Sequence, residues 1–160
     1  MNKQTTIFNL KNTFFTNPHG LSDPGPYSTS AEIGRLAAQV MKIPLIQKIV
    51  STYKYSCLSR GEQESKYFWT NTNSLVKGTD LAAAVPGGFD GVKTGITTIA
   101  GPCLTVRHPI SGLIITVLNS RTQEAKFVEV VKITQWALWK INNEKVPSYS
   151  RPKRASHEIS

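Results

Sequence analysis

The sequence predicts an α+β fold in which helices flank an antiparallel sheet. Apolar residues recur at helical spacing within 29–50 and again within 123–141. Between these segments lie two short strand patterns, 103–107 and 113–119, joined by a Pro- and Gly-containing stretch that suits a hairpin. Helices followed by antiparallel strands and a final helix are the order typical of the α+β class.

The first clear helix is expected to begin at Thr29, because Thr29-Ser30-Ala31-Glu32 has capping-box spacing, with Glu32 reaching back to the N-cap. Pro44 ends this helix, and a short second helix follows over 45–50. The segment 51–66 is polar and is expected to be irregular. The apolar face of the first helix comprises Ile33, Leu36, Ala37, Val40 and Met41.

Residues 67–69 have strand character and 71–74 have the composition of a turn. The last helix, over 123–141, has one apolar face, and Trp136 and Trp139 are expected to pack on it. His108, in the presumed hairpin turn, is expected to be exposed. The residues on the apolar face are Phe127, Val131, Thr134, Leu138 and Ile141.

Composition limits the partners of this 160-residue chain. The net charge is +9, but the basic residues are scattered outside the tail 151–154 and do not alternate with aromatic residues, so no nucleic-acid partner is expected. Cys57 and Cys103 form no CxxC and have no nearby His cluster, so no metal site is expected; whether they form a disulfide stays open. No apolar run is long enough to span a bilayer.

The most informative motif is Lys93-Thr94-Gly95, because its surroundings are distinctive. It lies in Asp90-Gly91-Val92-Lys93-Thr94-Gly95, after a Gly-rich approach at 85–88 and before a turn ending in Ala100-Gly101. Upstream lie Asn17-Pro18-His19-Gly20-Leu21, Ser28-Thr29 at a helix start, and Asn71-Thr72-Asn73.

In this order the motifs resemble the D-alanyl-D-alanine carboxypeptidases, which are low-molecular-mass penicillin-binding proteins. The resemblance covers 1–141 and implies a partial β-lactamase/transpeptidase-like catalytic domain, followed by a polar, disordered tail over 142–160. It implies an acyl-enzyme mechanism on peptides ending in D-Ala-D-Ala, with such a peptide or a β-lactam as ligand and with no cofactor. Lys93, Thr94 and Gly95 would bind the substrate, Lys93 placing a cation beside its terminal carboxylate.

The sequence departs from the family pattern at the nucleophile. No Ser-x-Asn occurs, and the Ser-x-x-Lys matches at Ser51 and Ser150 lack the helical context that the chemistry needs. Met1 aligns just after the family's Ser-x-Asn region. The N-terminal part of the domain is therefore expected to be missing, and no catalytic residue is assigned.

Two functional hypotheses follow: a fragment of a serine-type carboxypeptidase, or a non-catalytic remnant that binds peptide or cell wall. A third reading is a remnant that does not fold. His19, Asn71 and Asn73 are candidates for the edge of the cleft, although loop ordering and turn formation are the simpler roles for them. Relatives act outside the cytoplasmic membrane, but no signal peptide is recognisable at the N-terminus, so localisation stays open.

Overall fold

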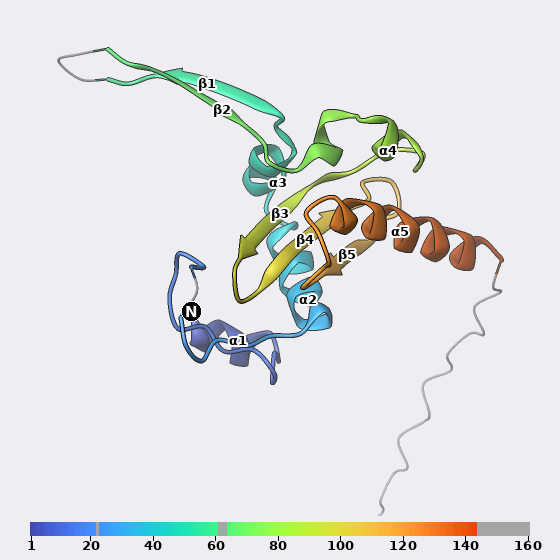
Figure 1. Cartoon of the computed structure of the whole chain (residues 1–160), viewed down its shortest axis with the longest axis horizontal. Coiled ribbons are helices and arrows are strands. Elements are labelled where there is room, and N and C mark those ends of the chain that lie inside the picture. Colours follow the sequence, from blue (N-terminus) through green and yellow to red (C-terminus); the bar gives the residue numbers. More distant parts are fainter. Residues whose placement is uncertain (22, 61–63, 144–160) are drawn as a thin grey trace, which may run out of the picture.

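The computed structural model describes residues 1–21, 23–60 and 64–143. Its centre is a three-stranded antiparallel sheet in the order β3-β4-β5, formed by β3 (Asp90–Thr97), β4 (Gly101–Arg107) and β5 (Ile114–Val117). Helix α2 (Ser30–Val40) packs on β5 and β4, and α5 (Ala125–Asn143) packs on the same two strands (Figure 1). The predicted strands and both long helices are therefore present.

The main core lies between the sheet and α5. Because side chains alternate along a strand, Leu104, Val106 and Ile115 share the face toward α5. Against them pack the short segments η1 (Ser74–Lys77) and α4 (Asp80–Ala83), which precede β3. The remaining buried members of this core are Leu75, Ala82, Val85, Phe89, Val130 and Val131.

On the other face of the sheet, α2 approaches β5 closely at Gly34. A Cβ on Gly34 would lie 3.5 Å from Thr116 Oγ1, and Thr116 and Thr105 approach each other at 3.1 Å between hydroxyl oxygens. Helix α2 ends at Val40, and Pro44 then occupies the first turn of α3 (Pro44–Ser51), where a proline costs no hydrogen bond.

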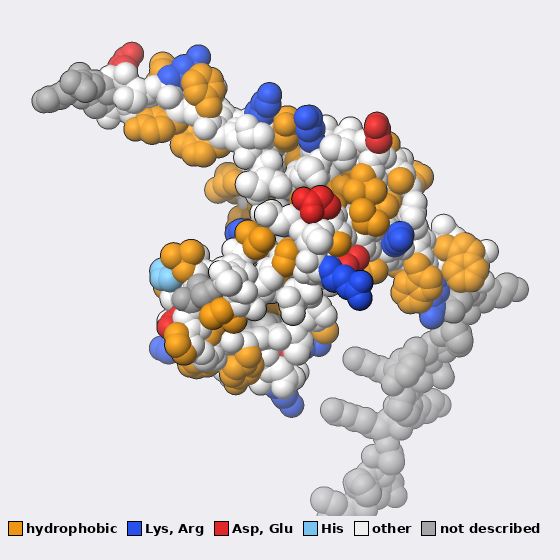
Figure 2. All heavy atoms as spheres, in the orientation of Figure 1, with side chains coloured by type: hydrophobic (Ala, Val, Ile, Leu, Met, Phe, Trp, Pro, Cys, Tyr) orange, Lys and Arg blue, Asp and Glu red, His pale blue; other side chains and the backbone are white. Residues whose placement is uncertain are grey.

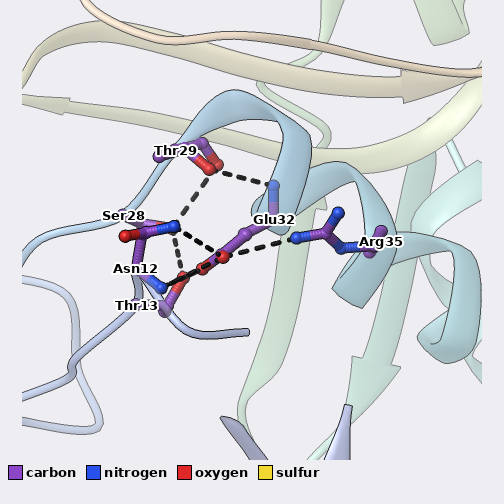
Figure 3. Close-up of polar contacts among 6 residues, drawn as sticks. All are labelled: Asn12, Thr13, Ser28, Thr29, Glu32 and Arg35. Carbon is purple, nitrogen blue, oxygen red and sulfur yellow. Dashed lines mark hydrogen bonds and ion pairs between the residues drawn. The ribbon is translucent and has the colours of Figure 1, made fainter. Parts of the chain in front are cut away.

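The start of α2 confirms half of the predicted capping box. Thr29 is the N-cap, and its hydroxyl accepts the Glu32 N–H at 3.2 Å. Glu32 does not reach back to the cap, so that part of the prediction is wrong. Its buried carboxylate instead accepts hydrogen bonds from Asn12 and Thr13 and pairs with Arg35, fastening α2 to the segment after α1 (Asn2–Ile7) (Figure 3).

A long hairpin extends away from this body (Figure 1). It consists of β1 (Lys54–Leu58) and β2 (Lys66–Thr70), paired antiparallel from Lys54↔Thr70 to Leu58↔Lys66. The strand predicted at 67–69 is confirmed, but the expectation of irregular structure over 51–66 is wrong at β1. That segment lacks an apolar alternation because nearly all side chains of β1 are exposed.

Three other sequence expectations are corrected. His108 is buried, with Nδ1 2.7 Å from Ser111 Oγ and Nε2 2.7 Å from the carbonyl oxygen of Pro86. Trp136 and Trp139 do not pack into the core; they are 57% and 61% exposed. Ile141 is also exposed, because α5 projects past the sheet at its C-terminal end (Figure 1).

The last helix ends slightly later than predicted. Helix α5 continues to Asn143, two residues beyond the predicted end, and the rest of the predicted tail, 144–160, lies outside the described residues. Cys57 and Cys103 are both free thiols. No helix in the described ranges is long and apolar enough to cross a bilayer.

Candidate functional site

The Lys-Thr-Gly motif lies in the middle of β3, at one side of the sheet. Lys93, Thr94 and Gly95 pair with Thr105, Leu104 and Cys103 of β4. Within the part of the chain that the structure describes, no strand pairs with the outer edge of β3. That edge therefore presents backbone groups to which an extended peptide could add.

Beside this edge is a small hollow of about 210 Å³ between β3, α3 and the turn after β2. Lys93 and Thr94 form one side, and Thr72 joins them across the hollow, with its hydroxyl oxygen 2.6 Å from that of Thr94. The other residues that line it are Ile49, Val50, Asn71, Asn73, Gly91 and Val92.

Asn71 and Asn73 build the turn that shapes the hollow. The side-chain oxygen of Asn71 accepts the Asn73 N–H, and that of Asn73 accepts the Leu75 N–H. Their amide groups donate inward as well, Asn73 to the carbonyl oxygen of Gly91 at 2.7 Å and Asn71 to that of Val50 at 3.0 Å. Both residues line this hollow, but their polar atoms are used to hold β3, α3 and the turn together.

Lys93 is the cation of the hollow. Its side chain is exposed, its ammonium group donates to the Thr94 carbonyl oxygen, and no ion pair of Lys93 occurs among the described residues. The nearby carboxylate of Asp90 is engaged by Arg107 of β4. The hydrogen bond with Asp90 raises the pKa of Arg107, more than burial lowers it. Lys93 is thus available to an anionic ligand.

The remaining sequence candidates lie elsewhere. Gly95 follows Thr94 on β3 but does not line the hollow. His19 does not line it either; its Nδ1 accepts the Leu21 N–H at 3.1 Å, which confirms its role in ordering its own loop. Thr72 lines the hollow but was not among the sequence candidates. Its position between two turn-forming asparagines was the available signal.

The Ser-x-x-Lys matches at Ser51 and Ser150 gain no support as nucleophiles. A third match, which was not among the sequence candidates, is Ser74 with Lys77; the two span the 3-10 helix η1, and neither lines the hollow. Ser51 is the last residue of α3 and donates to the Lys48 carbonyl oxygen at 3.2 Å, whereas Lys54 begins β1. One helical turn therefore does not separate them. Ser150 lies outside the described residues. No group of three or more His, Cys, Asp or Glu side chains that could hold a metal ion is found in the described ranges.

Comparison with known proteins places these features in context. The family model for D-alanyl-D-alanine carboxypeptidase matches residues 1–122. The chain is 34% identical over 139 residues to the D-alanyl-D-alanine carboxypeptidase DacF of Bacillus subtilis, covering 86% of this chain and 33% of that protein. It is 33% identical over 140 residues to DacA of Haemophilus influenzae, covering 85% and 32%. The chain thus spans about a third of the length of these relatives.

Solved structures give the same picture of the fold. The Streptomyces K15 DD-transpeptidase superposes with a TM-score of 0.76 at 28% identity, over 86% of this chain and 52% of that one. A D-alanyl-D-alanine carboxypeptidase from Mycobacterium tuberculosis superposes with a TM-score of 0.71 at 19% identity, over 86% and 51%. The predicted α+β class, as part of a transpeptidase-like domain, is confirmed.

Proposed function

The chain belongs to the D-alanyl-D-alanine carboxypeptidase family, and we propose that it supplies the substrate-carboxylate side of a serine-type carboxypeptidase site. The substrate would be a peptidoglycan stem peptide ending in D-Ala-D-Ala, and a β-lactam would occupy the same place. The observation that carries this proposal is the hollow that Lys93 lines together with Thr72 and Thr94, whose hydroxyls share a hydrogen bond.

Each residue has a defined part in the proposal. Lys93 attracts the terminal carboxylate of the peptide, and Thr94 donates a hydrogen bond to it. Thr72 orients the Thr94 hydroxyl by sharing a hydrogen bond with it. Gly95 carries no side chain that could hinder a peptide at β3. The chain itself would accept a Cβ there, 3.9 Å from Cys103 Cβ, so a role of this glycine lies in ligand approach and not in packing. The peptide backbone can then lie along the edge of β3.

Binding can be tested with the chain alone. Titration with N-acetyl-D-Ala-D-Ala in a calorimeter is expected to give saturable heat in the millimolar range. Lys93→Met and Thr94→Val are each expected to weaken binding by about tenfold or more, since each removes a hydrogen bond or charge that meets a carboxylate. Lys132→Met is the matched control, because Lys132 is an exposed lysine on α5. Absence of heat, or an equal loss in the control, would reject this role.

Catalysis is a separate part of the proposal. The chain contains no Ser-x-Asn, Ser51 is not followed by its lysine within a helix, and Ser74, which is followed by Lys77 within η1, does not line the hollow beside Lys93. We therefore propose that the nucleophile is not among these 160 residues, and that the chain alone binds without turnover. A fluorescent penicillin is expected to leave the chain unlabelled and to label a fusion in which the Ser-x-x-Lys and Ser-x-Asn segment of DacF precedes it. Labelling of the chain alone, lost in Ser51→Ala, would contradict this.

A further inference from the structure

A second, larger hollow of about 590 Å³ lies between α3 and the base of the β1–β2 hairpin. Its volume falls within the range of small-molecule sites, which are mostly apolar with a few polar groups. Its walls fit this description. The residues that matter for the argument are Leu45, Lys48, Ile49, Tyr53, Tyr55 and Trp69.

An aromatic row continues from this hollow along one face of the hairpin. Tyr55 and Trp69 are cross-strand partners with ring centroids 5.9 Å apart and planes 27° apart. Trp69 and Tyr67 are 5.7 Å and 14° apart. The three side chains are 60%, 51% and 48% exposed. A row of near-parallel aromatic rings that is half-exposed, on a hairpin with no core of its own, is typical of a recognition surface.

The charge around the hollow is positive. Lys48 lines it, and the ammonium groups of Lys54 and Lys77 lie over the Tyr53 ring at 5.6 and 5.8 Å. Among the described residues from 44 to 77 the acidic side chain is Glu64, two residues before Lys66 at the start of β2, which is the end of the hairpin away from the hollow. The surface therefore favours a ligand that carries negative charge.

We infer that this hollow and the aromatic row bind an acidic amino-sugar glycan strand, the polymer to which stem peptides are attached. The apolar C–H face of a sugar ring packs on an exposed aromatic ring, and successive rings of a strand match successive aromatic side chains. Lys48 would meet a carboxylate of the glycan. Thr52 and Thr70, also at the hollow, offer hydroxyls to sugar oxygens and amides.

The position of the hollow supports this occupant. It shares Ile49 and Asn71 with the hollow beside Lys93 and Thr94, so the two form one continuous surface. A polymer whose peptide end occupies the smaller hollow would have the larger hollow beside it. The choice of glycan thus rests on the proposed function, and it adds a recognition surface that the Lys-Thr-Gly motif does not provide.

Binding can be tested through the fluorescence of Trp69, which lines the hollow. Trp136→Phe/Trp139→Phe leaves Trp69 as the sole tryptophan, and both replaced residues are exposed. A peptide-free tetrasaccharide of alternating N-acetylglucosamine and N-acetylmuramic acid, which carries carboxylates, is expected to give a saturable change in Trp69 emission. Tyr55→Ala in this background should weaken binding on the order of tenfold. Lys48→Gln should weaken binding less and reduce its dependence on salt.

Tyr27→Ala is the matched control, because Tyr27 is 60% exposed and stacks on Phe14 away from the hairpin. It should leave the affinity unchanged. Near-UV circular dichroism checks the fold of each variant, and Lys48→Gln keeps the test decisive if Tyr55→Ala unfolds. No emission change at millimolar saccharide would overturn the inference. So would an equal loss in Tyr27→Ala, or a dimer in sedimentation that Tyr55→Ala dissociates.

Failure of this inference is distinguishable from failure of the proposed function. Thr94→Val should weaken binding of N-acetyl-D-Ala-D-Ala by about tenfold or more and leave binding of the saccharide intact. Tyr55→Ala should do the reverse. If Thr94→Val removed saccharide binding, the saccharide would bind at the smaller hollow and not at the larger one. That result would overturn the proposed glycan site.

Discussion

Glu32 is the residue that fastens the N-terminal segment to α2. Its buried carboxylate accepts the Asn12 N–H at 3.0 Å and the Thr13 hydroxyl at 2.5 Å, and Arg35 lies 3.3 Å away (Figure 3). Burial alone would raise the pKa of Glu32, but the hydrogen bonds from Thr13 and Asn12 and the charge of Arg35 outweigh it and lower the pKa. The charged form is therefore the one that the fold stabilises.

This lowered pKa predicts an acid-sensitive contribution to stability. A group whose pKa is lower when folded stabilises the protein above its ordinary pKa, and this contribution is lost as the pH falls through the folded value. Glu32→Gln is expected to be less stable than the native chain at neutral pH and to approach it in acid. Urea midpoints measured from neutral to strongly acidic pH check this. Glu124→Gln, at an exposed glutamate, is the control. If the urea midpoints of Glu32→Gln and of the native chain changed with pH in parallel, the lowered pKa of Glu32 would not contribute to stability.

Residue-scale roles were predictable from sequence only where the partner is local. The Thr29 cap and the turn-forming roles of Asn71 and Asn73 depend on residues two or three positions away, and they were anticipated. Glu32 and His108 were misjudged, because Asn12 lies 20 residues and Pro86 22 residues from them. A local sequence pattern gives no information about hydrogen-bond partners that lie so far away along the chain.

At the scale of elements, β3 is held against α3 by a glycine. Gly91 has φ +54°, and a Cβ there would lie 2.5 Å from Val50 Cγ2 of α3. Its carbonyl oxygen accepts the Asn73 amide, and Gly91, Val50 and Asn73 all line the hollow. The close approach of β3 to α3 therefore sets the width of the proposed carboxylate site.

Gly91→Ala is expected to damage both stability and the site. The left-handed backbone costs an alanine about 1–2 kcal/mol, and the clash with Val50 adds roughly 1–3 kcal/mol. Gly78→Ala separates the two effects, because Gly78 has φ +75° with nothing within 4 Å of its Cβ position. Urea unfolding should show the larger loss for Gly91→Ala, and only this variant should weaken N-acetyl-D-Ala-D-Ala binding. Equal losses of stability in the two variants would mean that α3 moves to accommodate the added methyl group without further cost.

Helices and strands were predicted mainly where buried apolar residues recur at a regular spacing in the sequence. Strands β4 and β5 and the inner face of α5 are buried and were predicted. Strand β2 is as exposed as β1 and was predicted from its aromatic run at 67–69, whereas β1 was missed because it has no such run. Trp136 and Trp139 were misplaced because the large aromatic side chains of α5 were expected in the core. The Lys-Thr-Gly motif was recognisable, but Thr72 became a site residue only through the turn that carries it to Thr94.

At the scale of the whole molecule, the two sheets differ in whether helices pack on them. The β3-β4-β5 sheet is covered by α2 and α5, and β4 is buried along most of its length. The β1–β2 hairpin projects from this body, with exposed side chains on nearly every position of both strands (Figure 1). Figure 2 shows apolar and basic side chains along it. A two-stranded ribbon without a core is marginally stable by itself.

Hydrogen exchange is therefore expected to show different amide protection in the hairpin and in the central sheet. Amides of 104–106 in β4 open only with the core, whereas those of 55–57 and 67–69 can open with the hairpin alone, at a lower free-energy cost. Mass-spectrometric exchange should give hairpin amides at least about tenfold less protection than β4, with Tyr55→Ala lowering protection of the hairpin and leaving β4 unchanged. Equal protection in both sheets would mean that the hairpin opens only in global unfolding. The aromatic row would then be positioned by the same core that holds Lys93 and Thr94, and Tyr55→Ala should lower the protection of β4 as well.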